Sequence, residues 1–309
     1  MGYAPISLNE LPTVEDRLSF LYLEHCVVHR KENSLTMRDE LGEVRVPAAA
    51  LSCLFLGPGT TVSHQAMVLA AECGISCVWI GQNGVRYYAH GRSLAQSTAL
   101  LVEQAKLVSN ERKRLAVARA MYQMRFSDED VSALTMRQLR GREGARMRQI
   151  YRDNARRTGV RWNGRQYDPK DFTASDAVNQ ALSTANFALY GVVHAVIVAL
   201  GCSPSLGFVH CGRERAFVFD MADLYKAEIS IPTAFDTAAE DTVDISAAVR
   251  KAVRDRIFDS KLVPRLVHDI KTLLGVDAQA DDDGATVLQL WDFRSGAVAA
   301  GTNYGGVPR

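Results

Sequence analysis

The sequence predicts an α+β protein with a β-rich region over residues 1–92, an all-α region over residues 93–276 and a flexible tail over residues 277–309. Short apolar runs separated by turn residues occur before Gly91 and are typical of strands. After Arg92 the apolar residues recur at the three- and four-residue spacing of long helices. We therefore expect a β-sandwich-like domain with one helix, followed by a helical domain.

Three strands and one helix are expected in the β-rich region. The runs at residues 20–23, 51–56 and 75–80 are strand-like, with turn signals such as Gly57-Pro-Gly59 and Gln82-Asn-Gly84 between and after them. Ser63 is a good N-cap and Gly74 a good stop signal. Together they predict a helix over residues 65–73.

Longer helices follow in the second region. We expect them over residues 94–126, 131–139, 141–158, 175–200, 243–258 and 261–274. The longest apolar run, residues 187–200, is shorter than the roughly 20 residues that a transmembrane helix needs. This run is therefore interpreted as a buried core helix.

Composition narrows the class of protein. The chain has 309 residues, 47% hydrophobic and 23% charged, with a net charge of +1, which argues against a generic nucleic-acid coat. The six cysteines form no CxxC pair and the N-terminus resembles no secretory signal. Reduced thiols in a cytoplasmic protein are expected.

Residues 137–165 form an arginine belt. Ten arginines stand against two acidic residues there, a local net charge of +8. The arginines are Arg137, Arg140, Arg142, Arg146, Arg148, Arg152, Arg156, Arg157, Arg161 and Arg165. Guanidinium groups make planar, bidentate contacts with phosphates, which favours nucleic-acid binding. A solvated helix face is the alternative interpretation.

Glu143 lies within this belt, between Arg142 and Arg146. A carboxylate among phosphate-binding groups suits a metal ion that touches the same phosphate. The alternative is an ordinary surface glutamate in a first helical turn, where negative charge is favoured in any case.

A second cluster of candidate ligands spans residues 207–226. His210 precedes a turn signal, and Ala216-Phe-Val-Phe219 leads to Asp220 at the expected start of a short helix over residues 221–226. Asp220 and Asp223 would then lie about 5–6 Å apart on one face, where a divalent cation relieves their repulsion. Asp220 is alternatively a plain N-cap.

Four stretches together resemble a known family. They are Gln138-Leu-Arg-Gly-Arg-Glu-Gly-Ala-Arg146, Trp162-Asn-Gly-Arg-Gln-Tyr-Asp-Pro-Lys-Asp171, Gly207-Phe-Val-His210 and Phe217-Val-Phe-Asp-Met-Ala-Asp-Leu-Tyr-Lys226. In this order they are similar to the CRISPR-associated spacer-acquisition integrase, in its type I-E (Cascade-type) form. The resemblance runs from about Leu18 to Leu274.

The resemblance implies roles for individual residues. Metal ligands fall on Glu143, His210 and Asp223, with Asp220 as an essential acidic neighbour. Tyr167 falls in the pocket that senses the motif beside captured DNA. Arg86, Arg140 and Arg213 fall near phosphates or DNA ends, and Arg146 and Arg148 of the belt are further candidates for DNA binding. His25 stands where related sequences carry a tyrosine that stacks on the duplex end.

The resemblance also implies partners and a reaction. Family members are homodimers, here through the N-terminal domain, and two dimers are bridged by a small ferredoxin-like protein into a heterohexamer. The expected reaction joins the 3′-hydroxyl ends of short foreign double-stranded DNA to the CRISPR repeat with Mg²⁺ or Mn²⁺, and branched DNA is also cut. A plain metal-dependent endonuclease and a non-catalytic DNA-binding scaffold remain alternatives.

Overall fold

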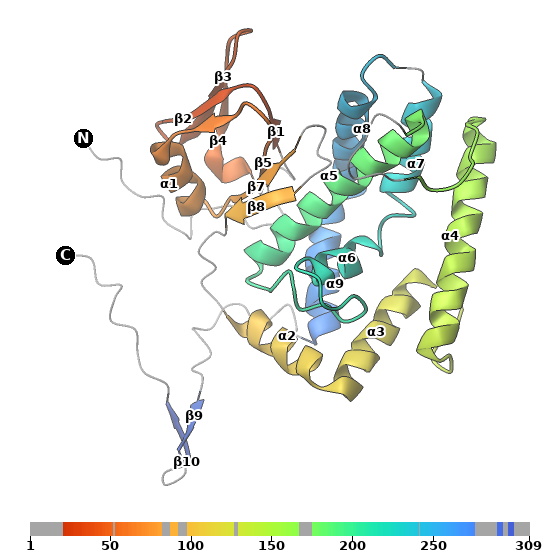
Figure 1. Ribbon diagram of the computed structural model, residues 1–309. Coiled ribbons are helices and arrows are strands. Elements are labelled where there is room, and N and C mark those ends of the chain that lie inside the picture. Colours follow the sequence, from red (N-terminus) through yellow and green to blue (C-terminus); the bar gives the residue numbers. More distant parts are fainter. Residues whose placement is uncertain are drawn as a thin grey trace.

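The computed structural model describes residues 21–51, 53–81, 87–91, 98–126, 129–166, 175–240, 242–275, 289–292 and 296–299. Within these ranges, two small sheets and one α-helix occupy the N-terminal part, and longer helices follow (Figure 1). The predicted α+β class is confirmed. The predicted boundary between residues 92 and 93 lies outside the described residues.

The first sheet leads toward the helical part. Its order is β1-β5-β7-β8, with β1, β5 and β7 parallel and β8 antiparallel to β7. These strands are Leu21–Leu23, Cys53–Leu56, Ser76–Ile80 and Tyr87–Gly91. The three predicted strands are therefore present, with bounds shifted by one or two residues. Strands β5 and β7 are apolar because both faces of the sheet are covered.

The second sheet contains strands that the sequence analysis did not identify. Its order is β4-β3-β2-β6, where β2 and β3 form an antiparallel hairpin. The strands are β2 Val27–Lys31, β3 Ser34–Arg38, β4 Glu43–Pro47 and β6 Thr61–Val62, and a short 3₁₀ helix, Ala48–Ala50, follows β4. Strand β4 is almost wholly exposed, so its residues lack the apolar signal of a core strand.

Helix α1, His64–Glu72, joins the two sheets into one core. The hydroxyl of Ser63 accepts a hydrogen bond from the Ala66 amide, as predicted for the N-cap. The helix packs against β2 of one sheet and β7 of the other. Buried Leu35, Leu54 and Leu69 fill the space between them.

The helical part begins with two helices where one was predicted. The expected helix over residues 94–126 is divided at Asn110 into α2, Ala99–Ser109, and α3, Glu111–Arg125. Asn110 has an extended backbone, and its side chain accepts a hydrogen bond from the Lys113 amide at 3.0 Å. The asparagine therefore starts a new helix, because its side chain replaces the missing backbone acceptor.

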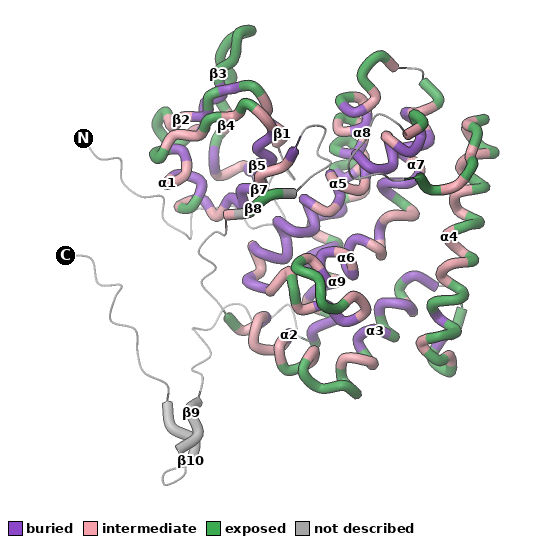
Figure 2. Tube along the Cα trace, viewed as in Figure 1, coloured by how far each residue is buried: buried purple, intermediate pink, exposed green. Residues whose placement is uncertain are grey.

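In the next segment, two predicted helices prove to be one. The helices predicted over residues 131–139 and 141–158 form a single helix, α4, Met136–Thr158. It begins with a capping box between Thr135 and Gln138 and ends at Gly159, whose φ is +73°. The glycine at position 141 is accommodated inside the helix. Helix α4 lies at the edge of the molecule, and of its residues only Leu139 is buried (Figures 1 and 2).

Helix α5, Ala177–Ala199, is the centre of the larger core. It packs against β5 and β7 of the first sheet and against the helices that follow it. These are α6 Ala216–Ala222, α7 Ser230–Ala239, α8 Ile245–Asp259 and α9 Leu262–Leu274. Gly191 permits the close approach to the sheet, since a side chain there would overlap the ring of Phe55.

By length and hydropathy α5 also qualifies as a membrane span, but 78% of its most apolar window is buried inside the protein (Figure 2). The prediction of a buried core helix is confirmed. Within the predicted flexible tail the structure describes an antiparallel pair, β9 Gln289–Asp292 and β10 Gly296–Ala299. The remaining tail residues lie outside the described part of the chain.

Candidate active site

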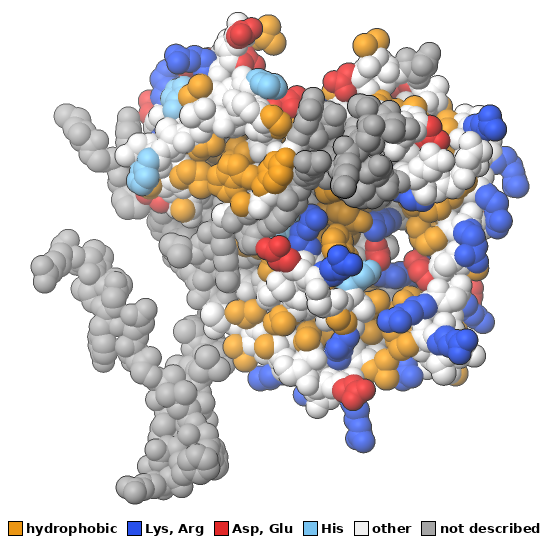
Figure 3. All heavy atoms as spheres, in the orientation of Figure 1, with side chains coloured by type: hydrophobic (Ala, Val, Ile, Leu, Met, Phe, Trp, Pro, Cys, Tyr) orange, Lys and Arg blue, Asp and Glu red, His pale blue; other side chains and the backbone are white. Residues whose placement is uncertain are grey.

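The arginine belt lies mainly on α4. Arg137, Arg140, Arg142, Arg148, Arg152, Arg156 and Arg157 are exposed there. The space-filling view shows Lys and Arg side chains gathered along the edge that α4 forms (Figure 3). The helix therefore presents a positively charged face to solvent, as the one-signed sequence run predicted. Its inner face carries Glu143, Met147 and Tyr151, which are spaced by four residues and line one cavity.

Glu143 is the carboxylate that α4 directs into this cavity. Its side chain is only 16% exposed, and Arg125 Nη1 and Arg146 Nη1 lie 3.7 and 3.9 Å from its two oxygens. Burial raises the pKa of Glu143, and the charge of Asp223 adds to this, while Arg125 and Arg146 oppose it. Its Oε2 atom is buried and has no hydrogen-bond partner among the described residues.

Asp220 does not start a helix. Helix α6 begins at Ala216, five residues earlier than expected, and Asp220 is a fully buried residue inside it. Its two oxygens accept hydrogen bonds from the amides of Phe208, Val209 and His210 at 2.6, 3.0 and 2.9 Å. The N-cap interpretation is therefore wrong, because apolar residues 216–219 already form the first turn. Asp220 fixes the segment that carries His210.

His210 is held by the same carboxylate. Its Nδ1 lies 2.7 Å from Asp220 Oδ1, which leaves Nε2 as the ring nitrogen for a further ligand. The ring packs edge-on against Phe219, with centroids 5.9 Å apart. Gly207 makes the tight approach possible, since a Cβ there would lie 2.5 Å from the His210 carbonyl oxygen.

Asp223 faces a different set of groups. Lys226 Nζ lies 2.6 Å from its Oδ1, and Arg125 Nη2 lies 3.7 Å from its Oδ2. Burial opposes the charge of Lys226, but the charge of Asp223 and the Tyr190 side chain outweigh it and raise the Lys226 pKa. The two aspartates thus have separate partners, since Asp220 accepts backbone amides whereas Asp223 is paired with Lys226 and Arg125.

Glu143 and Asp223 line the same cavity, of about 650 Å³, although 80 positions separate them in the chain. Lys226, Arg165 and Arg215 supply positive charge to its wall. The aromatic residues Tyr151, Phe187, Tyr190 and Phe219 make up much of the remainder. His210 approaches this wall through its contact with Phe219. The cavity thus combines acidic groups with cations that suit a phosphodiester.

The donor set fits a hard divalent cation in its chemistry. Glu143 has an oxygen without a hydrogen-bond partner, and His210 has its second nitrogen fixed by a carboxylate, as metal-bound histidines commonly do. As the side chains stand, however, no three His, Cys, Asp or Glu residues in the described ranges form a group that could hold a metal. Arg125 and Lys226 instead supply the positive charge.

The other candidate residues are distributed as follows. Arg140 is exposed beside Tyr122, Arg148 is exposed on α4, and Arg213 is exposed in the loop that follows His210. Arg146 is partly covered by its contact with Glu143. Arg86 and Tyr167 lie outside the described residues.

His25, at the expected tyrosine position, is exposed. It has a left-handed backbone with φ of 50°, and its amide donates to the Pro58 carbonyl at 2.9 Å. Histidine, like asparagine and aspartate, adopts this conformation more often than most residues other than glycine. The turn holds His25 next to Gly59. A side chain at position 59 would clash with the His25 imidazole, since a Cβ there would lie 2.5 Å from Nδ1.

The chain is similar to known proteins over most of its length. The family model described as CRISPR associated protein Cas1 matches residues 20–131 and 124–252. The chain belongs to the Cas1 family. A relative from Clostridium sp. (strain SY8519) named CRISPR-associated endonuclease Cas1 is 49% identical, over 95% of this chain and 98% of that protein. CRISPR-associated endonuclease Cas1 2 from Thermus thermophilus is 42% identical, over 97% of this chain and 94% of that protein.

A solved Cas1 structure is also similar. The crystal structure of a TtCas1-DNA complex matches with a TM-score of 0.80 and 40% identity, covering 92% of this chain and all of that chain. This similarity agrees with the order seen here, a strand-rich part followed by a helical part. The family part of the sequence-based resemblance is therefore confirmed.

Arg125 and Lys226 were missed as site residues. Arg125 is 3% exposed in its side chain and lies on the same face of α3 as buried Met121 and Tyr122. A signal was present in the sequence, because an arginine at the three- and four-residue spacing of an apolar face must be buried with a counter-charge. In this Cas1-family chain the counter-charges are Glu143 and Asp223.

One stability prediction follows from Glu143. Its pKa is raised in the folded state, so its contribution to stability is present at low pH and is lost as pH rises through the folded pKa. Glu143→Gln should therefore raise the melting temperature of the metal-free protein at pH 7–8, by roughly 1–4 °C. The gain should vanish toward about pH 4, near the ordinary glutamate pKa. Thermal unfolding in EDTA across this pH range measures it, and a lower melting temperature at pH 8 would contradict the assigned burial cost.

Proposed function

We propose that this Cas1-family chain is a divalent-metal-dependent DNA integrase of CRISPR adaptation. It joins the 3′-hydroxyl ends of short foreign DNA to the CRISPR repeat by transesterification, and it cuts branched DNA at the same site. The observation that carries the proposal is the cavity that Glu143 and Asp223 line together beneath an arginine-rich helix. His210, held by Asp220, packs against Phe219 of the cavity wall.

Glu143, His210 and Asp223 are the residues that would hold Mg²⁺ or Mn²⁺. When bound, such an ion polarises a phosphoryl oxygen and favours deprotonation of the attacking hydroxyl. Support comes from the unpartnered Glu143 oxygen and from the fixed imidazole. Oxygen ligands with one imidazole suit these ions better than a thiolate-binding metal.

Four neighbouring residues position the proposed metal ligands, balance their charge or contact the DNA. Asp220 orients the imidazole of His210 and fixes its loop through three backbone amides. Arg125 and Lys226 balance the two carboxylates before DNA arrives. Arg215, whose guanidinium lies over the Phe219 ring, is placed on the cavity wall to receive a phosphate oxygen.

The proposed function includes protein partners as well as DNA. We propose that the chain acts as a homodimer through its N-terminal domain and binds a small ferredoxin-like protein to form a heterohexamer on double-stranded DNA in the cytoplasm. The type I-E assignment rests on the sequence stretches that include Glu143, His210 and Asp223. A similar protein, TtCas1, has been crystallised as a complex with DNA.

Hydrolysis by the same site is the second candidate function. It is favoured by the names of the Clostridium and Thermus relatives, both called CRISPR-associated endonucleases. Water then replaces the 3′-hydroxyl as nucleophile, and the residues keep their roles. The two reactions share one set of groups and differ in the group that attacks the phosphate.

An assay with supercoiled repeat-bearing plasmid and a short labelled duplex separates the two. Integration predicts a covalently joined product that carries the label on relaxed plasmid, and that requires a free 3′-hydroxyl and Mg²⁺ or Mn²⁺. A duplex with 3′-dideoxy ends is the control. Nicked plasmid without label transfer would indicate hydrolysis alone, and no change with either metal would contradict both reactions.

A further inference from the structure

A second groove lies on the other side of Glu143. It has a volume of about 700 Å³ and runs between the end of α3 and the middle of α4. Arg142, Ala145, Arg146 and Gln149 line it at helical spacing, next to the stripe that contains Glu143. Two neighbouring stripes of one helix thus border two different cavities.

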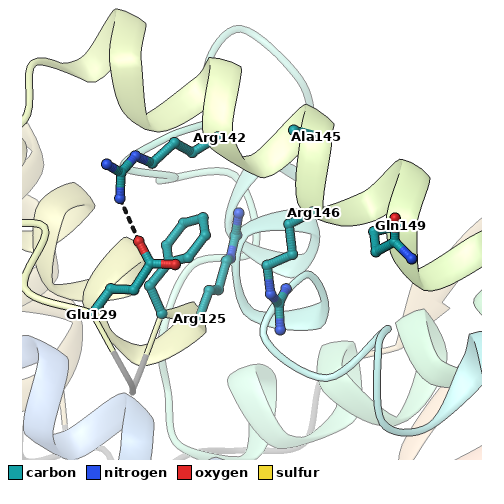
Figure 4. Close-up of a pocket in the computed structure, with 7 residues that line it drawn as sticks. Arg125, Glu129, Arg142, Ala145, Arg146 and Gln149 are labelled. Atoms are coloured by element: carbon teal, nitrogen blue, oxygen red, sulfur yellow. Dashed lines mark hydrogen bonds and ion pairs between the residues drawn. The ribbon is translucent and has the colours of Figure 1, made fainter.

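The charge of this groove is unbalanced. Three guanidinium groups, those of Arg125, Arg142 and Arg146, line it together with one carboxylate, Glu129. The close-up shows Arg142 pointing to Glu129, with which it forms an ion pair, while Arg125 and Arg146 extend into the space between the two helices (Figure 4). The pairing of Arg142 with the Glu129 carboxylate leaves Arg125 and Arg146 as the excess positive charge of the groove.

Arg125 connects the groove to the candidate metal site. Its side chain is 3% exposed, and its Nε has no hydrogen-bond partner among the described residues. Its two terminal nitrogens lie 3.7 Å from Glu143 and from Asp223. A buried guanidinium needs compensating negative charge. A cation held by those two carboxylates would take over much of the counter-charge of Arg125, and an anion on the groove side would restore it.

We propose that this groove binds a backbone phosphate of the DNA strand that passes the candidate metal site. Arg142 and Arg146 are its ligands, Arg125 supplies buried positive charge, and Glu129 occupies Arg142 until the phosphate displaces it. The inference rests on the proposed function, since it assumes that DNA lies in the neighbouring cavity. Planar guanidinium groups match the oxygens of a phosphodiester in a bidentate manner.

The test compares variants at the groove with a matched ion pair elsewhere. Arg265 and Glu228 form a bidentate ion pair at 2.7 and 2.8 Å. Their side chains are 44% and 45% exposed, close to the 49% and 54% of Arg142 and Glu129. The purified full-length protein is titrated onto a fluorescent duplex with 3′ overhangs in EDTA at several salt concentrations. Fluorescence anisotropy gives the affinity and its salt dependence.

Glu129→Gln is expected to tighten binding about three- to tenfold, since it frees Arg142, and more than Glu228→Gln does. Arg142→Ala should weaken binding and reduce the slope of log affinity against log salt by about 0.9, whereas Arg265→Ala should leave the slope unchanged. In the Arg142→Ala background Glu129→Gln should have no more effect than Glu228→Gln. Circular dichroism and melting curves check that the variants are folded.

Two outcomes would overturn the inference. One is a Glu129→Gln variant that binds no more tightly than Glu228→Gln. The other is a salt slope that Arg142→Ala leaves at the wild-type value. Failure of the wild-type protein to bind DNA would instead contradict the proposed function, so the two failures are distinguishable.

Discussion

Replacing Asp220 by alanine is expected to lower the free energy of unfolding by about 3–5 kcal/mol. Asp220 is fully buried and accepts hydrogen bonds from three backbone amides and from His210 Nδ1. Removal of the carboxylate leaves three amide donors without an acceptor, each at a cost of about 1–3 kcal/mol before the loop relaxes. A drop in melting temperature of roughly 10 °C should accompany this loss.

Asp244→Ala is the matched control for this substitution. Asp244 is also an aspartate that accepts a backbone amide hydrogen bond, at 2.9 Å from Ala247, but it is an exposed N-cap. Its loss should cost about 1 kcal/mol. Chemical denaturation of both variants gives the comparison. Equal losses would show that Asp220 does not hold the 207–210 loop in the manner described.

Replacing His210 by alanine is expected to reduce strand joining by at least about 10²-fold, the scale seen when one group that stabilises transition-state charge is removed. DNA affinity should stay within about twofold of the wild type, because the substitution leaves the arginines of α4, proposed to bind phosphates, untouched. Melting temperature should fall far less than in Asp220→Ala, since Asp220 keeps its three amide donors. Label transfer to plasmid, anisotropy and thermal melts measure the three quantities.

His268→Ala serves as the control, because His268 is an exposed histidine on α9. It should join DNA at the wild-type rate. If His210→Ala joined as fast as this control while binding DNA normally, the site would not be the catalyst. The non-catalytic scaffold would then be the better description of the protein.

Local signals predicted much of the fold. Ser63 and Gly74 marked α1 correctly because capping is a local interaction. Asn110 carried a similar signal, but the apolar spacing on both sides suggested one continuous helix. Strands β2 to β4 were missed because their burial depends on the partner sheet and on α1. Tertiary contacts of this kind leave little periodicity in a half-exposed strand.

The sequence indicated two of the residues that the fold brings together, but not the contacts that hold them. Glu143 and Asp223 do line one cavity, as their chemistry suggested. The role of Asp220 depends on amides that lie 10 to 12 positions earlier in a loop, and no local pattern reveals that contact. Arg125 depends on two carboxylates from α4 and the end of α6. Such pairings form only when distant segments pack together.

A Mn²⁺ titration tests the central claim most directly, that Glu143, His210 and Asp223 together bind a divalent cation. Free Mn²⁺ is followed by electron paramagnetic resonance in wild type, Glu143→Gln, Asp223→Asn and the surface variant Glu228→Gln. The account predicts saturable binding that weakens at least about tenfold in the two site variants and is unchanged in Glu228→Gln. Equal Mn²⁺ affinity in all four proteins would contradict it.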